Sequence, residues 1–161
     1  MAVGQKLRKG LLVLHIIVSV GWIGAALAFL AVAASMRQPA TPEAEQAALS
    51  MMETIGWTVL VPLSLASLLT GILQSLVTPW GLVRHYWVLT KLLITVVATV
   101  VLLVFMQGFG HGVGGAGGLH GNTPGSSAIL HASGGLVLLA LAVLLSVYKP
   151  RGLTGWGVRR A

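Results

Sequence analysis

The sequence predicts an all-α integral membrane protein, a four-helix bundle with both termini cytoplasmic and a short outer helix before the second span. Two properties of its 161 residues lead to this fold class: the mean hydropathy is +0.92, and only 8% of the residues are charged. Soluble domains carry about 25% charged residues. The apolar residues also fall into four separate runs, each long enough to cross a hydrocarbon core of about 30 Å as a helix. We therefore expect a single membrane domain over residues 1–161, surrounded by the lipid bilayer.

The four apolar runs give the expected spans in chain order. We place them at residues 10–35, 55–77, 86–106 and 127–148. None alternates strictly between apolar and polar residues, as barrel strands do, so each is expected to be a helix. The first run is longer than the apolar region of a signal peptide, which is about 7–15 residues, so we expect it to be retained as a span.

The two outer connections differ in character. Thr41, Pro42 and Glu43 are typical of a helix start, because they offer an N-cap, a first-turn proline and an acid at the positive end of the helix dipole. A short outer helix is therefore expected to lead from Pro42 into the second span. Pro62 lies inside that span and is expected to bend it. The second outer connection, 108–125, is rich in glycine, and we do not expect it to pack a core of its own.

The basic residues indicate the orientation in the membrane. Those on the side of the termini are Lys6, Arg8, Lys9, Arg84, Lys149, Arg151, Arg159 and Arg160. The opposite side holds Arg37 together with all three glutamates. Because cytoplasmic segments carry the excess of Lys and Arg, we expect both termini in the cytoplasm. Basic residues dispersed in this way form no single patch, so nucleic-acid binding is not expected.

The composition excludes several kinds of active site. There is no cysteine, which excludes disulfides, iron–sulfur clusters and the covalent attachment of c-type haem. No acidic residue lies within a span and the chain has no aspartate, so paired-carboxylate and Ser-His-Asp chemistry are not expected. No phosphate-binding glycine motif follows a strand. The polar groups inside the spans remain as functional candidates, because a polar group in hydrocarbon needs a partner.

The first span contains a histidine among small residues. His15, Ser19 and Trp22 share one face of the expected helix, and the nearby Gly21 and Gly24 allow a helix or a flat ligand to approach closely. Two interpretations of His15 remain open: it binds a cofactor or carries a proton, or it is hydrogen-bonded within a packed bundle.

Lys91 is the second unusual residue, in the third span. It lies about 9 Å along the helix from His85, which we expect at the membrane surface beside Arg84. Lys91 either extends back to the cytoplasmic interface or is buried. A buried Lys91 needs an anion that the protein does not supply, such as a haem propionate, because every glutamate lies on the outer side.

A second group of candidate ligands lies toward the outer side. Its members are His111, His120, His131, Met36, Met51, Met52 and Met106. Imidazole and thioether ligands together select copper, particularly Cu(I), although methionine is also an ordinary core residue. Gly134 and Gly135 open the helix surface beside His131. His15 and His131 lie near opposite membrane faces, so more than about 10 Å separates them and they cannot share one metal.

Several short motifs resemble known families. Leu14-His15 followed by Gly21-Trp22-Ile23-Gly24 resembles the first span of CopD-like copper-resistance proteins and of HemJ-type protoporphyrinogen oxidases. Trp87 and Lys91-Leu92-Leu93 resemble the third span of both groups. The stretch Tyr148-Lys149-Pro150-Arg151-Gly152 resembles an uncharacterised family of small bacterial membrane proteins from the same broad group, which implies that the chain lies in the plasma (inner) membrane of a bacterium.

These resemblances imply different ligands. The resemblance to HemJ implies that His15 ligates b-type haem and that Lys91 is its companion functional residue. The chain lacks that family's Tyr-His pair late in the third span and its Arg-rich end of the first span, so haem binding is implied more than protoporphyrinogen oxidation. The resemblance to CopD implies copper handling by the outer His and Met residues.

Three hypotheses for the function follow. The first is a b-haem-binding membrane protein with a redox role, with His15 as an axial ligand, Ser19, Trp22 and Lys91 around the pocket, and His85 as a further candidate. The second is copper binding or transport by His111, His120, His131, Met51, Met52 and Met106, with His15 as a separate candidate ligand. The third is a homo-oligomer or a non-catalytic subunit of a larger membrane complex, for which the stripe of Ser67, Gly71 and Ser75 offers a packing surface, unless that stripe only seals the bundle.

Overall fold

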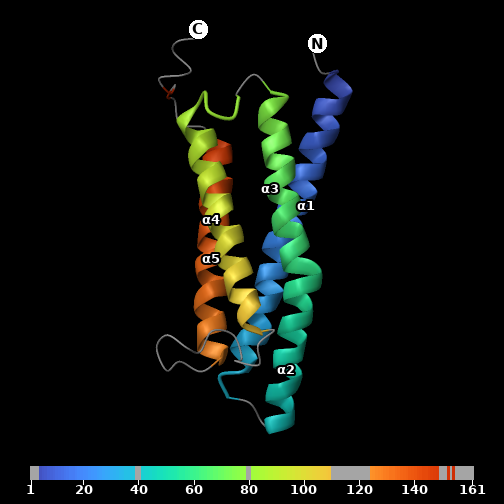
Figure 1. Cartoon of the computed structure of the whole chain (residues 1–161), viewed down its shortest axis with the longest axis vertical. Helices are drawn as coiled ribbons and strands as arrows, with labels where there is room; N and C mark the ends of the chain where they lie inside the picture. The colour runs from blue at the N-terminus through green and yellow to red at the C-terminus, as the bar shows by residue number, and fades with distance from the viewer. Residues whose placement is uncertain are drawn as a thin grey trace.

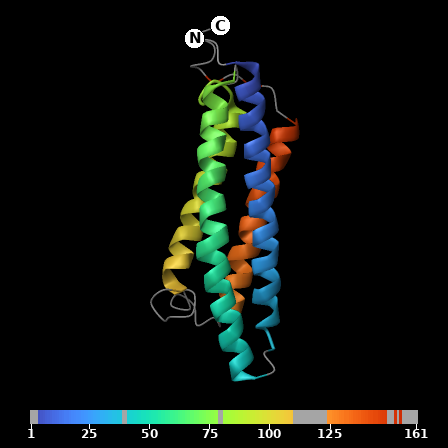
Figure 2. The ribbon, with the colours of Figure 1, turned by 90° about the vertical axis from the view of Figure 1, so that its right-hand side faces the viewer.

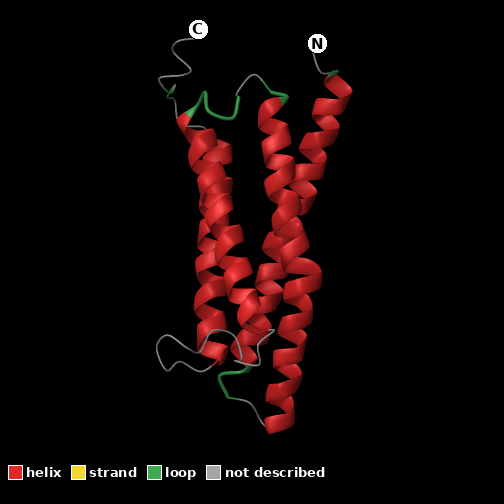
Figure 3. Cartoon of the chain, viewed as in Figure 1, coloured by secondary structure: helices red, strands yellow, loops and turns green. Residues whose placement is uncertain are grey.

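The computed structural model describes residues 4–38, 41–78, 81–109 and 124–148, together with Gly152 and Thr154. Its elements are α1 (Gln5–Ser35), α2 (Pro42–Ile55), the π-helical turn η1 (Gly56–Leu60), α3 (Val61–Leu76), α4 (Tyr86–Phe109) and α5 (Pro124–Tyr148). Within the described residues every regular element is helical (Figure 3). Four helices are long and apolar enough to cross a membrane when α2, η1 and α3 are taken as one. The all-α fold with four candidate spans is therefore confirmed, while the orientation stays a prediction.

The helices run side by side along the long axis of the molecule (Figure 1, Figure 2). α1 packs against α3 and α5, and α4 packs against the same two helices. Going around the bundle, the order is therefore α1, α3, α4, α5. α1 begins and α5 ends at the same end of the bundle, which we call the terminal end (Figure 1). α2 lies at the opposite end, which we call the α2 end.

The second span begins earlier in the chain than its apolar run indicates. The Thr41 hydroxyl accepts a hydrogen bond from the Ala44 N–H at 3.2 Å, with Pro42 in the first turn. The expected helix start is thus confirmed. α2 then continues through η1 into α3, which gives helical structure from Pro42 to Leu76, about 50 Å of helix.

Pro62 is preceded by a π-helical turn. The Val61 N–H donates to the carbonyl of Gly56, five residues earlier. Proline lacks an N–H, and its ring clashes with the carbonyl four residues before it in an α-helix. A wider turn displaces that carbonyl, so the chain remains helical through a residue that the sequence predicts to bend it.

The bundle is divided into an apolar half and a polar half. Near the α2 end, buried Trp22 and Phe29 of α1 join Phe105 of α4 in one apolar cluster, and the Phe29 and Phe105 rings meet edge to face at 6.2 Å. Toward the terminal end the α1–α3 contact is made by polar side chains instead. Large apolar residues on the outside of the helices are exposed, as expected of surfaces that lipid covers.

Two residues beyond α5 fix the connection between α3 and α4. The buried Thr154 donates its N–H to the Arg84 carbonyl at 3.0 Å, and its hydroxyl donates to the carbonyl of Val83. The Tyr86 N–H donates to the Gly152 carbonyl at 3.4 Å. The start of α4 is therefore held at the terminal end by backbone groups from the far end of the sequence.

Candidate functional site

His15 is held in one orientation by α3. Its Nδ1 lies 2.9 Å from the Thr70 hydroxyl. The Thr70 hydroxyl donates its own proton to the Ala66 carbonyl at 2.7 Å, so it accepts the hydrogen bond from His15 Nδ1–H. In the neutral ring this leaves Nε2 unprotonated, with a lone pair for a metal or a donor.

A second polar pair lies one turn further along the same contact. The Ser19 and Ser67 hydroxyls are 2.8 Å apart. Gly71 of α3 faces the imidazole, since a Cβ at this position would lie 3.2 Å from His15 Cε1. Glycine therefore lets the ring rest directly against the backbone of α3.

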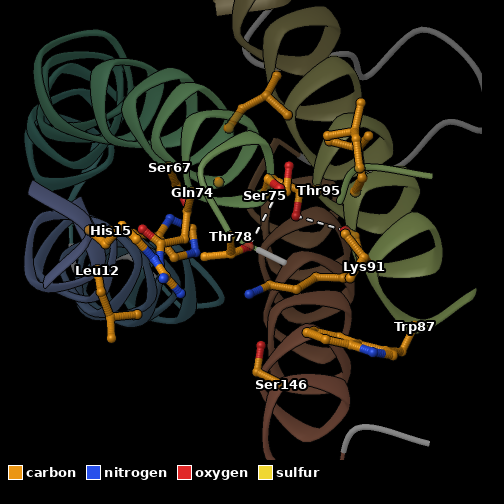
Figure 4. Close-up of a pocket in the computed structure, with 16 residues that line it drawn as sticks. Leu12, His15, Ser67, Gln74, Ser75, Thr78, Trp87, Lys91, Thr95 and Ser146 are labelled. Atoms are coloured by element: carbon orange, nitrogen blue, oxygen red, sulfur yellow. Dashed lines mark hydrogen bonds between the residues drawn. The ribbon is translucent and has the colours of Figure 1, made fainter. Parts of the chain in front are cut away.

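His15 lines a cavity of about 390 Å³ inside the terminal half of the bundle. This volume lies within the range of small-molecule sites, about 300–1,000 Å³. All four spans contribute to the wall, and Figure 4 shows His15 and Lys91 reaching into the cavity from opposite sides. The polar lining residues are Arg8, His15, Ser67, Gln74, Ser75, Thr78, Lys91, Thr95 and Ser146. Leu12, Leu68, Leu82, Val88, Leu92 and the indole of Trp87 supply the apolar part of the wall.

The cavity carries positive charge without an acidic partner. Lys91 of α4 and Arg8 of α1 both line it, and no carboxylate does. The three glutamates of the chain all lie on α2, at the other end of the bundle. Among the described residues, Arg8 Nε and Gln74 Oε1 are buried atoms without a hydrogen-bond partner. Buried charges and polar atoms are costly when they are unpaired, so an anionic ligand with hydrogen-bonding atoms suits this cavity.

The structure brings His15 and Lys91 together but separates the other candidates for haem binding. Ser19 lies at the α1–α3 contact, bonded to Ser67. Trp22 is buried on the same helix but lines a different cavity. His85 is half-buried just before α4, where its carbonyl accepts the Leu89 N–H at 3.3 Å, and it does not line the His15 cavity.

Three of the four outer methionines, Met36, Met52 and Met106, belong to one buried apolar cluster. Met52 and Met106 are fully buried in the core, whereas Met51 is 58% exposed. His131 lines a second cavity, and His111 and His120 lie outside the described residues. In the part of the chain that the structure describes, no three His, Cys, Asp or Glu side chains are grouped to hold a metal. A copper site at this end stays a prediction.

The small-residue stripe of α3 faces the interior of the bundle. Ser67 and Ser75 are buried, and Gly71 packs against the His15 ring. The stripe therefore seals the α1–α3 contact and lines the cavity. Packing of the chain into a larger complex would need another surface.

The sequence analysis assigned Ser67, Gly71 and Ser75 of α3 to helix packing and did not include Thr70, Gln74 or Thr78. These three residues are spaced four apart on the same span as that stripe. That spacing is typical of a polar stripe on one helix face. It could have been found because polar residues within a span face the interior of a bundle.

Comparisons of this chain with known proteins gave no match. No family model matches it, and neither a curated protein nor a solved structure shows a match.

Proposed function

We propose that this protein binds b-type haem in the cavity that His15 lines and that the bound haem gives it a redox role. The observation that carries this proposal is the lining of the cavity, where an imidazole and two cationic side chains, Lys91 and Arg8, surround a space without a carboxylate. Haem offers the complementary groups, since its iron accepts an imidazole nitrogen and its propionates are anions.

The donor set is suited to this group. The hydrogen bond from His15 Nδ1–H to Thr70 leaves Nε2 as the ligating atom, and a hydrogen bond to the other ring nitrogen is the usual support of a histidine ligand. Lys91 and Arg8 would pair with the propionates, because a buried cation requires an anionic partner. The apolar wall, including Leu12 and Trp87, suits a mostly hydrophobic ring.

The protein's part in the chemistry is to hold and tune the group. Bound haem would supply one-electron transfer. Thr70 fixes the tautomer and orientation of His15. The positive charge of Lys91 would stabilise the reduced state of the haem. Replacing Lys91 by a neutral residue is therefore expected to lower the reduction potential of the site.

The test is the absorption spectrum of protein purified from haem-sufficient cells. We expect a Soret band and about one haem per chain by the pyridine haemochrome assay. His15→Ala is expected to lose this band, whereas His85→Ala and His131→Ala serve as matched histidine controls and are expected to keep it. A colourless original chain, or a His15→Ala variant with an unchanged spectrum, would contradict the proposal.

A rescue experiment separates ligation from folding. In His15→Gly, added imidazole is expected to restore the Soret band, because the small molecule replaces the missing side chain at the iron. Lys91→Arg is expected to retain more haem than Lys91→Met, because it keeps the charge. Equal haem content in the two Lys91 variants would contradict the role of the Lys91 charge in holding the haem.

A further inference from the structure

A second cavity lies in the other half of the bundle and has no part in the proposed haem site. Its volume is about 450 Å³, and its walls come from α1, α4 and α5, with Leu60 of η1. The cavity exists because small residues, notably Ala26, Ala98 and Gly135, line the facing helices. A Cβ added at Gly134 or Gly135 would meet no atom within 4 Å. These two glycines of α5 therefore leave open space at the cavity.

The lining of this cavity is apolar and uncharged, with two polar side-chain groups. One is the imidazole of His131 and the other is the indole N–H of Trp22. His131 Nδ1–H donates to the Ser127 carbonyl at 2.8 Å, so in the neutral ring Nε2 is a hydrogen-bond acceptor. The imidazole stacks on the Phe105 ring, with centroids 4.5 Å apart and planes 24° from parallel. Both contacts hold the ring in one orientation at the cavity wall.

The rim of the cavity includes exposed residues of α4 and α5. Val101 is 44% exposed and Leu130 is 67% exposed, and Gly134 is exposed on the same side of α5. In a bilayer such apolar surface is covered by lipid. A ligand dissolved in the membrane could therefore enter between these helices without crossing water.

We propose that this second cavity binds a lipid-soluble quinol, with one ring hydroxyl donating a hydrogen bond to Nε2 of His131. The aromatic walls formed by Trp22, Phe29 and Phe105 suit a flat ring. The lack of charged lining residues excludes anionic headgroups, because a buried anion would have no cationic partner. A plain acyl chain would make no use of the imidazole acceptor. The inference concerns a different site from the haem proposal and does not rest on it.

Binding can be measured without haem, in the His15→Ala background reconstituted into lipid nanodiscs. The probes are decylubiquinol and decylbenzene. The readout is saturable quenching of the protein's tryptophan fluorescence or calorimetric titration. Decylubiquinol is expected to bind, and Gly135→Leu is expected to weaken it by at least about tenfold, since the new side chain fills the space that the ring needs. Gly24→Leu is the matched control, because Gly24 is exposed with no atom within 4 Å of a Cβ. Its affinity is expected to be unchanged.

A second variant tests the acceptor. His131→Phe keeps an aromatic ring against Phe105 but removes the nitrogen, so decylubiquinol is expected to bind about tenfold more weakly while decylbenzene binding is unaffected.

Equal affinities for decylubiquinol and decylbenzene in the original chain would overturn the quinol assignment in favour of an acyl-chain pocket. Undiminished quinol binding by Gly135→Leu would overturn the location. The Soret band of Gly135→Leu in the otherwise original chain is expected to be unchanged, so failure of either proposal can be distinguished from failure of the other.

Discussion

At the scale of single residues, the site depends on hydrogen bonds that pass from side chain to side chain to backbone. His15 donates to Thr70, and Thr70 donates to the Ala66 carbonyl. The Thr70 hydroxyl proton is thus committed to the Ala66 carbonyl, which determines the direction of the bond to His15. These bonds therefore decide which imidazole nitrogen carries the proton.

Replacing Thr70 by valine tests this arrangement. The valine variant has nearly the same shape but no acceptor, and a half-buried N–H left unpaired costs about 1–3 kcal/mol. We expect the free energy of unfolding in mixed micelles to fall by about this amount for Thr70→Val and by clearly less for Thr70→Ser. Equal losses in the two variants would show that the hydroxyl is not what holds His15.

At the scale of elements, Gly56 at the start of η1 leaves room for a side chain of α4. Gly56 has no side chain, and the thioether of the fully buried Met106 occupies the place where a Cβ would lie, with Cε only 2.1 Å from that position. Gly56 is also the first residue of the π-helical turn, so this contact and the wide turn lie at the same point of the second span. η1 also contributes Leu60 to the second cavity.

Gly56→Ala is expected to lower the free energy of unfolding by about 1–3 kcal/mol, because the new methyl overpacks a filled part of the core. Met106→Ala alone is also expected to lower stability, because it leaves a cavity in the core. The loss in the double variant is expected to be smaller than the sum of the two single losses, since the two changes share one contact. Gly24→Ala is the control and is expected to change stability by less than about 0.5 kcal/mol. Additive losses in the double variant would contradict the proposed clash. Unfolding in mixed micelles, followed by far-ultraviolet circular dichroism, measures the two single variants, the double variant and the control.

At the scale of the whole molecule, the charge asymmetry coincides with the division of the interior. The terminal end carries Lys6, Lys9 and Arg84 on its surface and has the cationic cavity beneath it. The α2 end carries Arg37 beside the glutamates of α2 and has the apolar core beneath it. We therefore propose that the terminal end faces the cytoplasm, in agreement with the excess of Lys and Arg there.

The absence of native cysteine makes this orientation directly testable. Single cysteines at Gln5 and Val83 lie at the terminal end, and one at Gln38 lies at the other, all in exposed positions. In intact cells, a membrane-impermeant maleimide is expected to label Gln38→Cys but not Gln5→Cys or Val83→Cys until the membrane is opened. The opposite labelling pattern would reverse the proposed sidedness of both cavities.

The sequence predicted the helices better than it predicted their partners. The four apolar runs and the Thr41 helix start were recognisable because hydrophobic length and capping are local properties of the chain. The π-helical turn before Pro62 was not, since a proline in a helix can be accommodated by a bend, by a wider turn or by both, and Met106 of α4 packs against Gly56 at that turn. Trp22 shares a helix face with His15 but lines another cavity, because a helix that packs against two neighbours divides its residues between them along its length.

The sequence by itself determined that this chain is a bundle of four apolar helices with an intramembrane histidine and lysine, because composition and run length dictate how a chain meets lipid. Only the tertiary structure decided that His15 and Lys91 share one cavity, that Thr70 orients the imidazole, and that His131 belongs to a second cavity. Those facts depend on which helix faces meet. Between largely apolar helices, that choice is made by the shapes of small residues and by a few hydrogen bonds rather than by hydrophobicity.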